Sequence, residues 1–172
     1  RRCADTSGRS LRRADRPPIL EAILGRNMSQ LRAAIDDGAN LEVPDADGRT
    51  GLHHAVITGE VEQVVMLLAA GASAGAADHQ GWTPLHFAVQ GHHLEAAKAL
   101  LAAGAPVDAE DGNGNTPLLR AVFESRGRGE MIALLRRSGA DMNRKNRSGV
   151  SPVELANTIA NYDVKKWLTE DP

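Results

Sequence analysis

The chain has 172 residues, of which 42% are hydrophobic, 24% charged and 3% aromatic, and its formal net charge is −2. This composition excludes a disordered, collagen-like or disulfide-stapled chain, and the single cysteine, Cys3, can form neither an internal disulfide nor a thiolate metal cluster. No stretch approaches the roughly 18 apolar residues of a membrane span, and no signal peptide is visible. We therefore expect a cytoplasmic protein without membrane contact, unless a leader was removed before Arg1.

The charge is distributed unevenly along the chain. Residues 1–16 carry a net charge of +4, and residues 33–119 carry twelve acidic against two basic groups, a net −10. Residues 120–147 carry eight basic against three acidic groups, a net +5. We expect residues 1–11 to form a poorly ordered N-terminal arm rather than a targeting signal.

The rest of the chain repeats itself with a period of 33 residues. Residues 45–53 (DADGRTGLH) align with residues 78–86 (DHQGWTPLH) and then with residues 111–118 (DGNGNTPL). A Gly-Ala pair recurs at Gly38, Gly71, Gly104 and, after two extra residues, Gly139. One domain over residues 12–172 therefore divides into repeats at 12–44, 45–77, 78–110 and 111–145, with a cap at 146–172.

Each repeat predicts a turn followed by two antiparallel helices. Thr83 suits an N-cap and Pro84 suits the first helical position. A second apolar face runs over residues 94–101 and stops at Gly104, a residue that tolerates the left-handed conformation. A helical hairpin of this size cannot bury its own apolar faces, so neighbouring units must stack. The sequence therefore predicts an all-α solenoid.

With its Asp-x-x-Gly-x-Thr-Pro-Leu-His motif at residues 78–86, the chain resembles the ankyrin-repeat family. This resemblance implies an ankyrin-repeat solenoid of four repeats plus a C-terminal cap. The chain departs from the motif in several respects. The first repeat lacks the turn motif, Gly51 replaces the helix-starting proline, and His92 falls where Gly59 stands. Two residues are inserted within 123–128, which puts Arg136 where Leu68 and Leu101 stand. We expect Tyr162, Val164, Trp167 and Leu168 to close the far end.

The motifs of nucleotide, metal and hydrolase sites are missing from the sequence, so we expect no enzyme, no cofactor and no metal. The resemblance implies a structural hydrogen bond for His53 and His86. The recurring Asp45, Asp78 and Asp111 stand at turn entries, where a carboxylate accepts backbone N–H bonds. The basic residues of 120–147 lack interleaved aromatics, which favours a solvated face over a nucleic-acid site.

The resemblance also implies a binding surface, the concave groove lined by the turn tips and the first helices. Carried over by position, the candidate partner-binding residues are Asp47, Arg49, Ile57, His79, Gln80, Trp82, Gln90, Asn113, Asn115, Phe123 and Glu124, with Arg126 and Arg128 in the inserted loop. Ile57, Trp82 and Phe123 are the expected apolar anchors. The alternatives are that Trp82 packs against the neighbouring turn and that Phe123 is buried beside the loop.

Two functions follow for such a non-catalytic, protein-binding module. Residues 115–118 and 156–164 resemble small bacterial ankyrin proteins that act as immunity proteins beside secreted toxins. That resemblance implies a monomer that occludes one protein partner, and the acidic 33–119 segment suits a basic toxin. The alternative is a regulatory scaffold or kinase-inhibitor-like adaptor.

Overall fold

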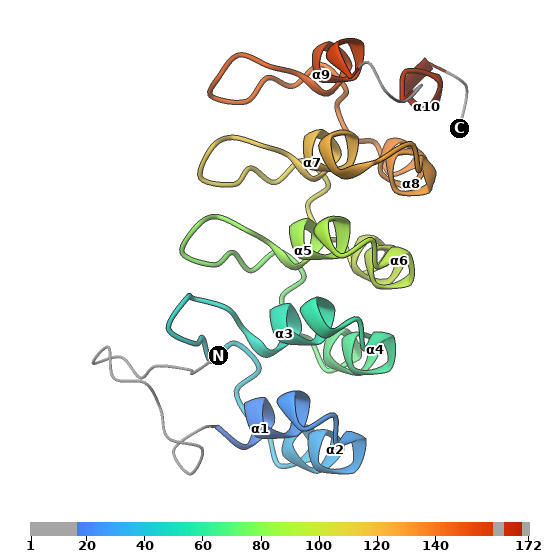
Figure 1. Ribbon diagram of the computed structural model, residues 1–172. Coiled ribbons are helices and arrows are strands. Elements are labelled where there is room, and N and C mark those ends of the chain that lie inside the picture. The colour runs from blue at the N-terminus through green and yellow to red at the C-terminus, as the bar shows by residue number, and fades with distance from the viewer. Residues whose placement is uncertain (1–16, 160–163, 170–172) are drawn as a thin grey trace.

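A computed structural model describes residues 17–159 and 164–169, and all regular secondary structure within them is helical. The helices form five stacked pairs, α1 (Pro18–Leu24) with α2 (Met28–Asp36), α3 (Gly51–Thr58) with α4 (Val61–Ala69), α5 (Pro84–Gln90) with α6 (Leu94–Ala102), α7 (Pro117–Glu124) with α8 (Glu130–Arg137), and α9 (Pro152–Thr158) with α10 (Lys166–Thr169). This arrangement confirms the predicted solenoid (Figure 1). The predicted N-terminal arm and Tyr162 lie outside the described residues.

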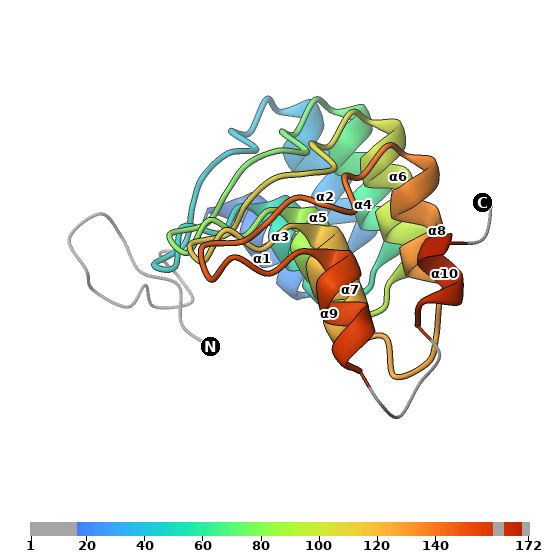
Figure 2. The same ribbon diagram turned by 90° about the horizontal axis from the view of Figure 1, so that it is seen from above.

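The first and second helices form two parallel layers, and long turns project from the same side of the stack. Four of these turns, at residues 45–50, 78–83, 111–116 and 146–151, are called fingers below. Seen along the stack, the fingers lie almost over one another (Figure 2). The fingers and first helices therefore form one continuous inner face.

Local sequence explains where the first helices begin and end. Thr83 precedes Pro84 as the N-cap of α5, and Thr50 caps α3 although Gly51 replaces the proline. Gly59 ends α3 with a φ of +74°. At the matching place His92 has a φ of +53°, which confirms the alignment with Gly59. A left-handed conformation at a residue with a side chain costs about 1–2 kcal/mol.

Small and medium aliphatic side chains fill the space between the two layers. Leu52, Leu85 and Leu118 recur every 33 residues on the first helices, and each is at most 1% exposed. Leu67 and Leu100 occupy matching places on the second helices. Buried alanines such as Ala88 let adjacent helix pairs approach closely. This periodic core explains how a chain with few aromatics can fold.

The short helix α10 closes the far end of the core. Val164 and Leu168 are buried there, as predicted, and Trp167 is half-buried. Arg136 stands where the other repeats carry Leu68 and Leu101, and its Nη1 donates a hydrogen bond of 2.9 Å to the Trp167 carbonyl oxygen. The departure at Arg136 therefore ties α8 to the cap.

Candidate protein-binding groove

A carboxylate or amide at the entry of each finger fixes its shape. Asp78 Oδ1 accepts hydrogen bonds from the backbone N–H groups of Gln80 (2.8 Å) and Trp82 (2.9 Å). The same pair of bonds forms at Asp45 and Asp111, and at Asn146 in the last finger. Partial burial raises the pKa of Asp45, but hydrogen bonds from His54 and from two backbone N–H groups outweigh it and lower that pKa to about 2. The predicted role of these residues is confirmed.

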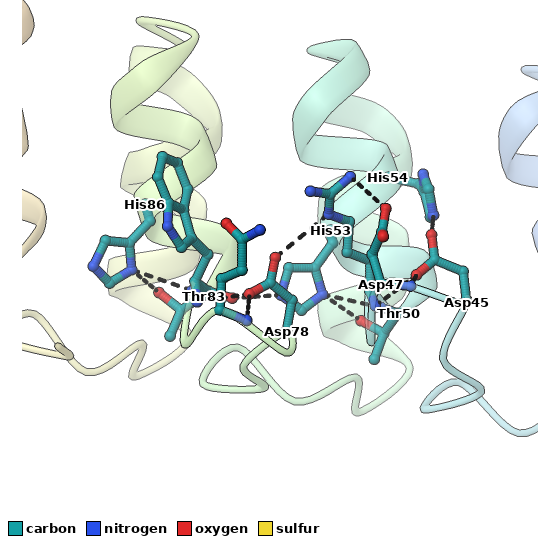
Figure 3. Close-up of polar contacts among 11 residues, drawn as sticks. Asp45, Asp47, Thr50, His53, His54, Asp78, Thr83 and His86 are labelled. Carbon is teal, nitrogen blue, oxygen red and sulfur yellow. Dashed lines mark hydrogen bonds and ion pairs between the residues drawn. The ribbon is translucent and has the colours of Figure 1, made fainter. Parts of the chain in front are cut away.

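His53 and His86 join consecutive repeats. Figure 3 shows both rings beside the threonines of their own fingers, Thr50 and Thr83. The Nδ1 of His53 accepts the Thr50 N–H at 3.0 Å, and its Nε2 bonds the Trp82 carbonyl oxygen at 3.1 Å. His86 makes the same contacts with Thr83 and with the Asn115 carbonyl oxygen. Both rings are fully buried, and burial lowers the pKa of each histidine. They are neutral structural links, as the resemblance implied.

The fingers are also bonded to one another through the backbone. His79 N–H donates to the Asp47 carbonyl oxygen at 2.9 Å, Gly112 N–H to that of Gln80 at 2.7 Å, and Arg147 N–H to that of Asn113 at 3.0 Å. Gly48 shows how close the fingers approach, because a Cβ there would lie 2.6 Å from the His79 ring. The backbone hydrogen bonds between fingers therefore hold them as one preorganised surface.

A stack of two aromatic rings between two cations crosses the middle of the inner face. Arg49 lies 5.0 Å from the Phe87 ring centroid, Phe87 lies 5.0 Å from Trp82, and Arg120 lies 3.8 Å from Trp82. The two guanidinium groups also bind the buried carboxylates of Asp78 and Asp111. The stack spans three repeats and fixes the Trp82 ring on the groove floor.

The structure places the predicted partner-binding residues on the inner face and the inserted loop, with different exposures. Phe123 is 69% exposed and Ile57 37% exposed. The other exposed ones are Asp47, His79, Gln80, Gln90, Asn113, Arg126 and Arg128, whereas Arg49, Trp82, Asn115 and Glu124 are half-buried. Phe123 is thus not buried beside the loop, and Trp82 does pack against its neighbours. Their contact with a partner remains a prediction.

Sequence reasoning missed several residues of this face. The sequence favours a solvated face for the basic run that includes Arg120, but its guanidinium is held between Asp111 and the Trp82 ring. That expectation is wrong for Arg120, because the residue at this helical position faces the neighbouring repeat. Phe87 was not singled out, and the spacing from Trp82 to Phe87 around the helix start was the available signal.

Two hollows of similar size lie in this part of the stack, one beside α7 and one beside the start of α8. One, of about 270 Å³, lies on the inner face between the fourth and fifth helix pairs and is lined by Asn115, Leu119, Arg120, Phe123, Asn146, Val150 and Leu155. We call it the junction pocket. The other, of about 260 Å³, is lined by His92, Leu94, Arg128, Glu130 and Met131 beside the inserted loop. Burial first, and then the charge of Arg128, lowers the pKa of His92.

Within residues 17–159 and 164–169, no three histidine, cysteine or carboxylate side chains are placed to hold a metal ion. Among the described helices, none has both the length and the apolar character to cross a bilayer.

The comparison with family models agrees with this architecture. The description "Ankyrin repeats (3 copies)" matches residues 59–146, more than half of the chain, and "Ankyrin repeats (many copies)" matches residues 19–68. The chain belongs to the ankyrin-repeat family, whose repeats form protein-interaction modules. No curated protein matches the chain significantly.

Proposed function

We propose that this ankyrin module is a dedicated inhibitor of one protein partner, an immunity protein that masks a secreted toxin by occupying its surface. The observation that carries partner binding is Phe123, a large apolar side chain left 69% exposed on the groove. Exposed apolar side chains on an otherwise polar face favour protein contact. The module acts as a cytoplasmic monomer in this proposal, with no chemistry of its own.

The rigidity of the groove supports inhibition by occlusion. Backbone bonds between fingers and the His53 and His86 links hold the inner face in place before a partner arrives. A preorganised surface loses little conformational entropy on binding, which favours tight one-to-one complexes. An adaptor with several partners gains more from adaptable surfaces.

The charges offered to a partner are fewer than the composition suggests. Asp78 and Asp111 are buried and bound to Arg49 and Arg120, and Glu110 pairs with Arg144. Asp36, Asp37, Glu42, Asp47 and Glu62 remain exposed. Asp47 is the exposed carboxylate on a finger tip. Its Oδ2 lies 3.3 Å from Arg49 Nη1, but 61% of its side chain stays exposed, so steering of a basic partner through the groove depends on it most.

Capture followed by rescue tests the proposal. The chain, immobilised, is incubated with lysate of its native host at low and high salt, and a captured protein is expressed in cells with and without the chain. We expect one stoichiometric partner that stops growth when expressed alone, with growth restored by the chain. Asp47→Lys with Phe123→Ala should abolish rescue.

The matched control is Val65→Ala, which removes an apolar side chain that is 50% exposed on α4, away from the fingers. It should rescue like the original chain. Several substoichiometric partners without toxicity would contradict the immunity role and favour the adaptor.

A further inference from the structure

The junction pocket lies where the repeat departs from its pattern. In the Thr-Pro-Leu-His motif the fourth repeat carries Leu119 where His53 and His86 stand. The carbonyl oxygens of Trp82 and Asn115 each accept a histidine bond as well as a backbone bond within their finger. The equivalent Val150 carbonyl oxygen accepts a backbone bond from Asn146, and no side chain of the described residues bonds it. The histidine bond that links the earlier repeats is therefore replaced at this junction by the apolar side chain of Leu119.

The neighbouring positions are apolar as well. Leu155 stands where Phe87 and Arg120 stand in earlier repeats, and Val150 stands where Trp82 and Asn115 stand. The third side of the pocket is Phe123. At this junction the stack of rings and cations ends, and the inner face is hollowed instead of filled.

The polar rim of the pocket is already satisfied. Asn146 Nδ2 donates to Asn115 Oδ1 at 2.8 Å, Asn115 Nδ2 donates to Asp111 Oδ2 at 3.1 Å, and Arg120 binds the same carboxylate. The amide and guanidinium groups of these lining residues therefore already have partners within the chain and are not the main groups that a ligand would recognise. The pocket offers apolar contact, and its 270 Å³ falls below the roughly 300–1,000 Å³ of small-molecule sites.

Exposed positive charge beside the pocket indicates which residues should lie next to the guest side chain in a partner. Arg147 is exposed on the finger, directly after Asn146 of the pocket rim. It forms no ion pair with another described residue. An apolar side chain seated in the pocket would thus have one available guanidinium group beside the rim, and a guanidinium favours a carboxylate.

We propose that the junction pocket holds one large apolar side chain of a partner protein, with a carboxylate next to it in the partner's chain that meets Arg147. This inference rests on the proposed function and adds a specificity subsite to it. With Asp47 near the other end, the groove has opposite charges along its length, so a partner fits in one direction.

Peptide titration tests the subsite. The probes are capped nine-residue Gly/Ser peptides with a central Asp-Phe-Asp, Lys-Phe-Lys or Asp-Ala-Asp, added to the full chain labelled at leucine and valine methyl groups. We expect saturable NMR shifts at Leu119, Val150 and Leu155 with Asp-Phe-Asp. We expect binding weakened at least about fivefold with Lys-Phe-Lys and absent with Asp-Ala-Asp, as loss of an anchoring contact predicts.

Two variants separate binding from folding. Phe123→Ala, at an exposed position, should weaken the Asp-Phe-Asp peptide at least about fivefold, whereas Val65→Ala should leave it unchanged. No saturable shift, equal binding of the lysine peptide, or self-association through Phe123 in sedimentation without peptide would overturn the subsite. If peptides fail while a captured toxin still depends on Asp47, the subsite alone is wrong. If peptides bind but no toxin is captured, the proposed function alone is wrong.

Discussion

The guanidinium of Arg120 lies 3.8 Å from the centroid of the Trp82 ring, so two consecutive repeats are joined through a cation and an aromatic ring. Arg120 also binds the fully buried carboxylate of Asp111, which accepts the backbone bonds that shape the finger 111–116. One side chain thus couples the finger, the ring on the groove floor and the helix behind it.

Removal of Arg120 is expected to cost far more stability than removal of an exposed partner. Arg120→Ala leaves Asp111 buried without its cation and should lower the free energy of unfolding by about 2–3 kcal/mol. Arg144→Ala breaks the exposed pair with Glu110 and should cost less than about 1 kcal/mol. Urea unfolding measures both, and equal losses would show that the Arg120 contacts contribute little.

His86→Leu tests the link between the third and fourth repeats. Leucine already occupies this slot at position 119, so the side chain fits, but the bonds to Thr83 and to the Asn115 carbonyl oxygen are lost. We expect a loss of about 1–3 kcal/mol in chemical unfolding. The control His79→Leu, on an exposed finger position, should change stability by less than about 0.5 kcal/mol.

Stability should fall as the pH falls below 6.5, the ordinary pKa of histidine. Because burial lowers the pKa of His53 and His86, the unfolded chain binds protons in this range that the folded chain does not. Asp45, with a pKa of about 2, acts in a lower window, because its stabilisation is present above pH 3.8 and is lost below it. Urea unfolding between about pH 7.5 and pH 5 isolates the histidines.

The His53→Gln, His86→Gln double variant serves as the control for that titration. Its free energy of unfolding should be lower than that of the original chain and should change less between about pH 7.5 and pH 5. If the original chain shows a flat profile and the double variant does not differ in slope, the two histidines do not govern the acid response.

Gly129→Ala is expected to detach the cap. A Cβ at this buried position would collide with the indole ring of Trp167, so α10 must move. The expected cost is about 1–3 kcal/mol, with a shifted Trp167 indole resonance in NMR spectra. Gly139→Ala has open space but a φ of +90°, and it should cost about 1 kcal/mol without moving that resonance. An unmoved resonance in Gly129→Ala would contradict the packing of the cap.

The repeat pattern was sufficient to predict the solenoid because each unit carries its own start and stop signals, such as Thr83-Pro84 and Gly104. The role of Asp78 followed for the same reason, since it acts within one finger. The role of His86 came instead from the resemblance to the ankyrin-repeat family. The stack of Arg49, Phe87, Trp82 and Arg120 and the junction pocket could not be predicted from the repeat pattern. Arg120 and Leu119 take their roles from side chains one repeat away, and a pairing across repeats is not visible in local spacing.

Hydrogen–deuterium exchange of the chain, alone and with its captured partner, tests the use of the groove most directly. We predict slower exchange at the fingers 78–83 and 111–116 and at the C-terminal turn of α7 around Phe123, with the outer helices α4 and α6 unchanged. Protection confined to α4 and α6, with the fingers unaffected, would place the interface on the opposite side and contradict the account.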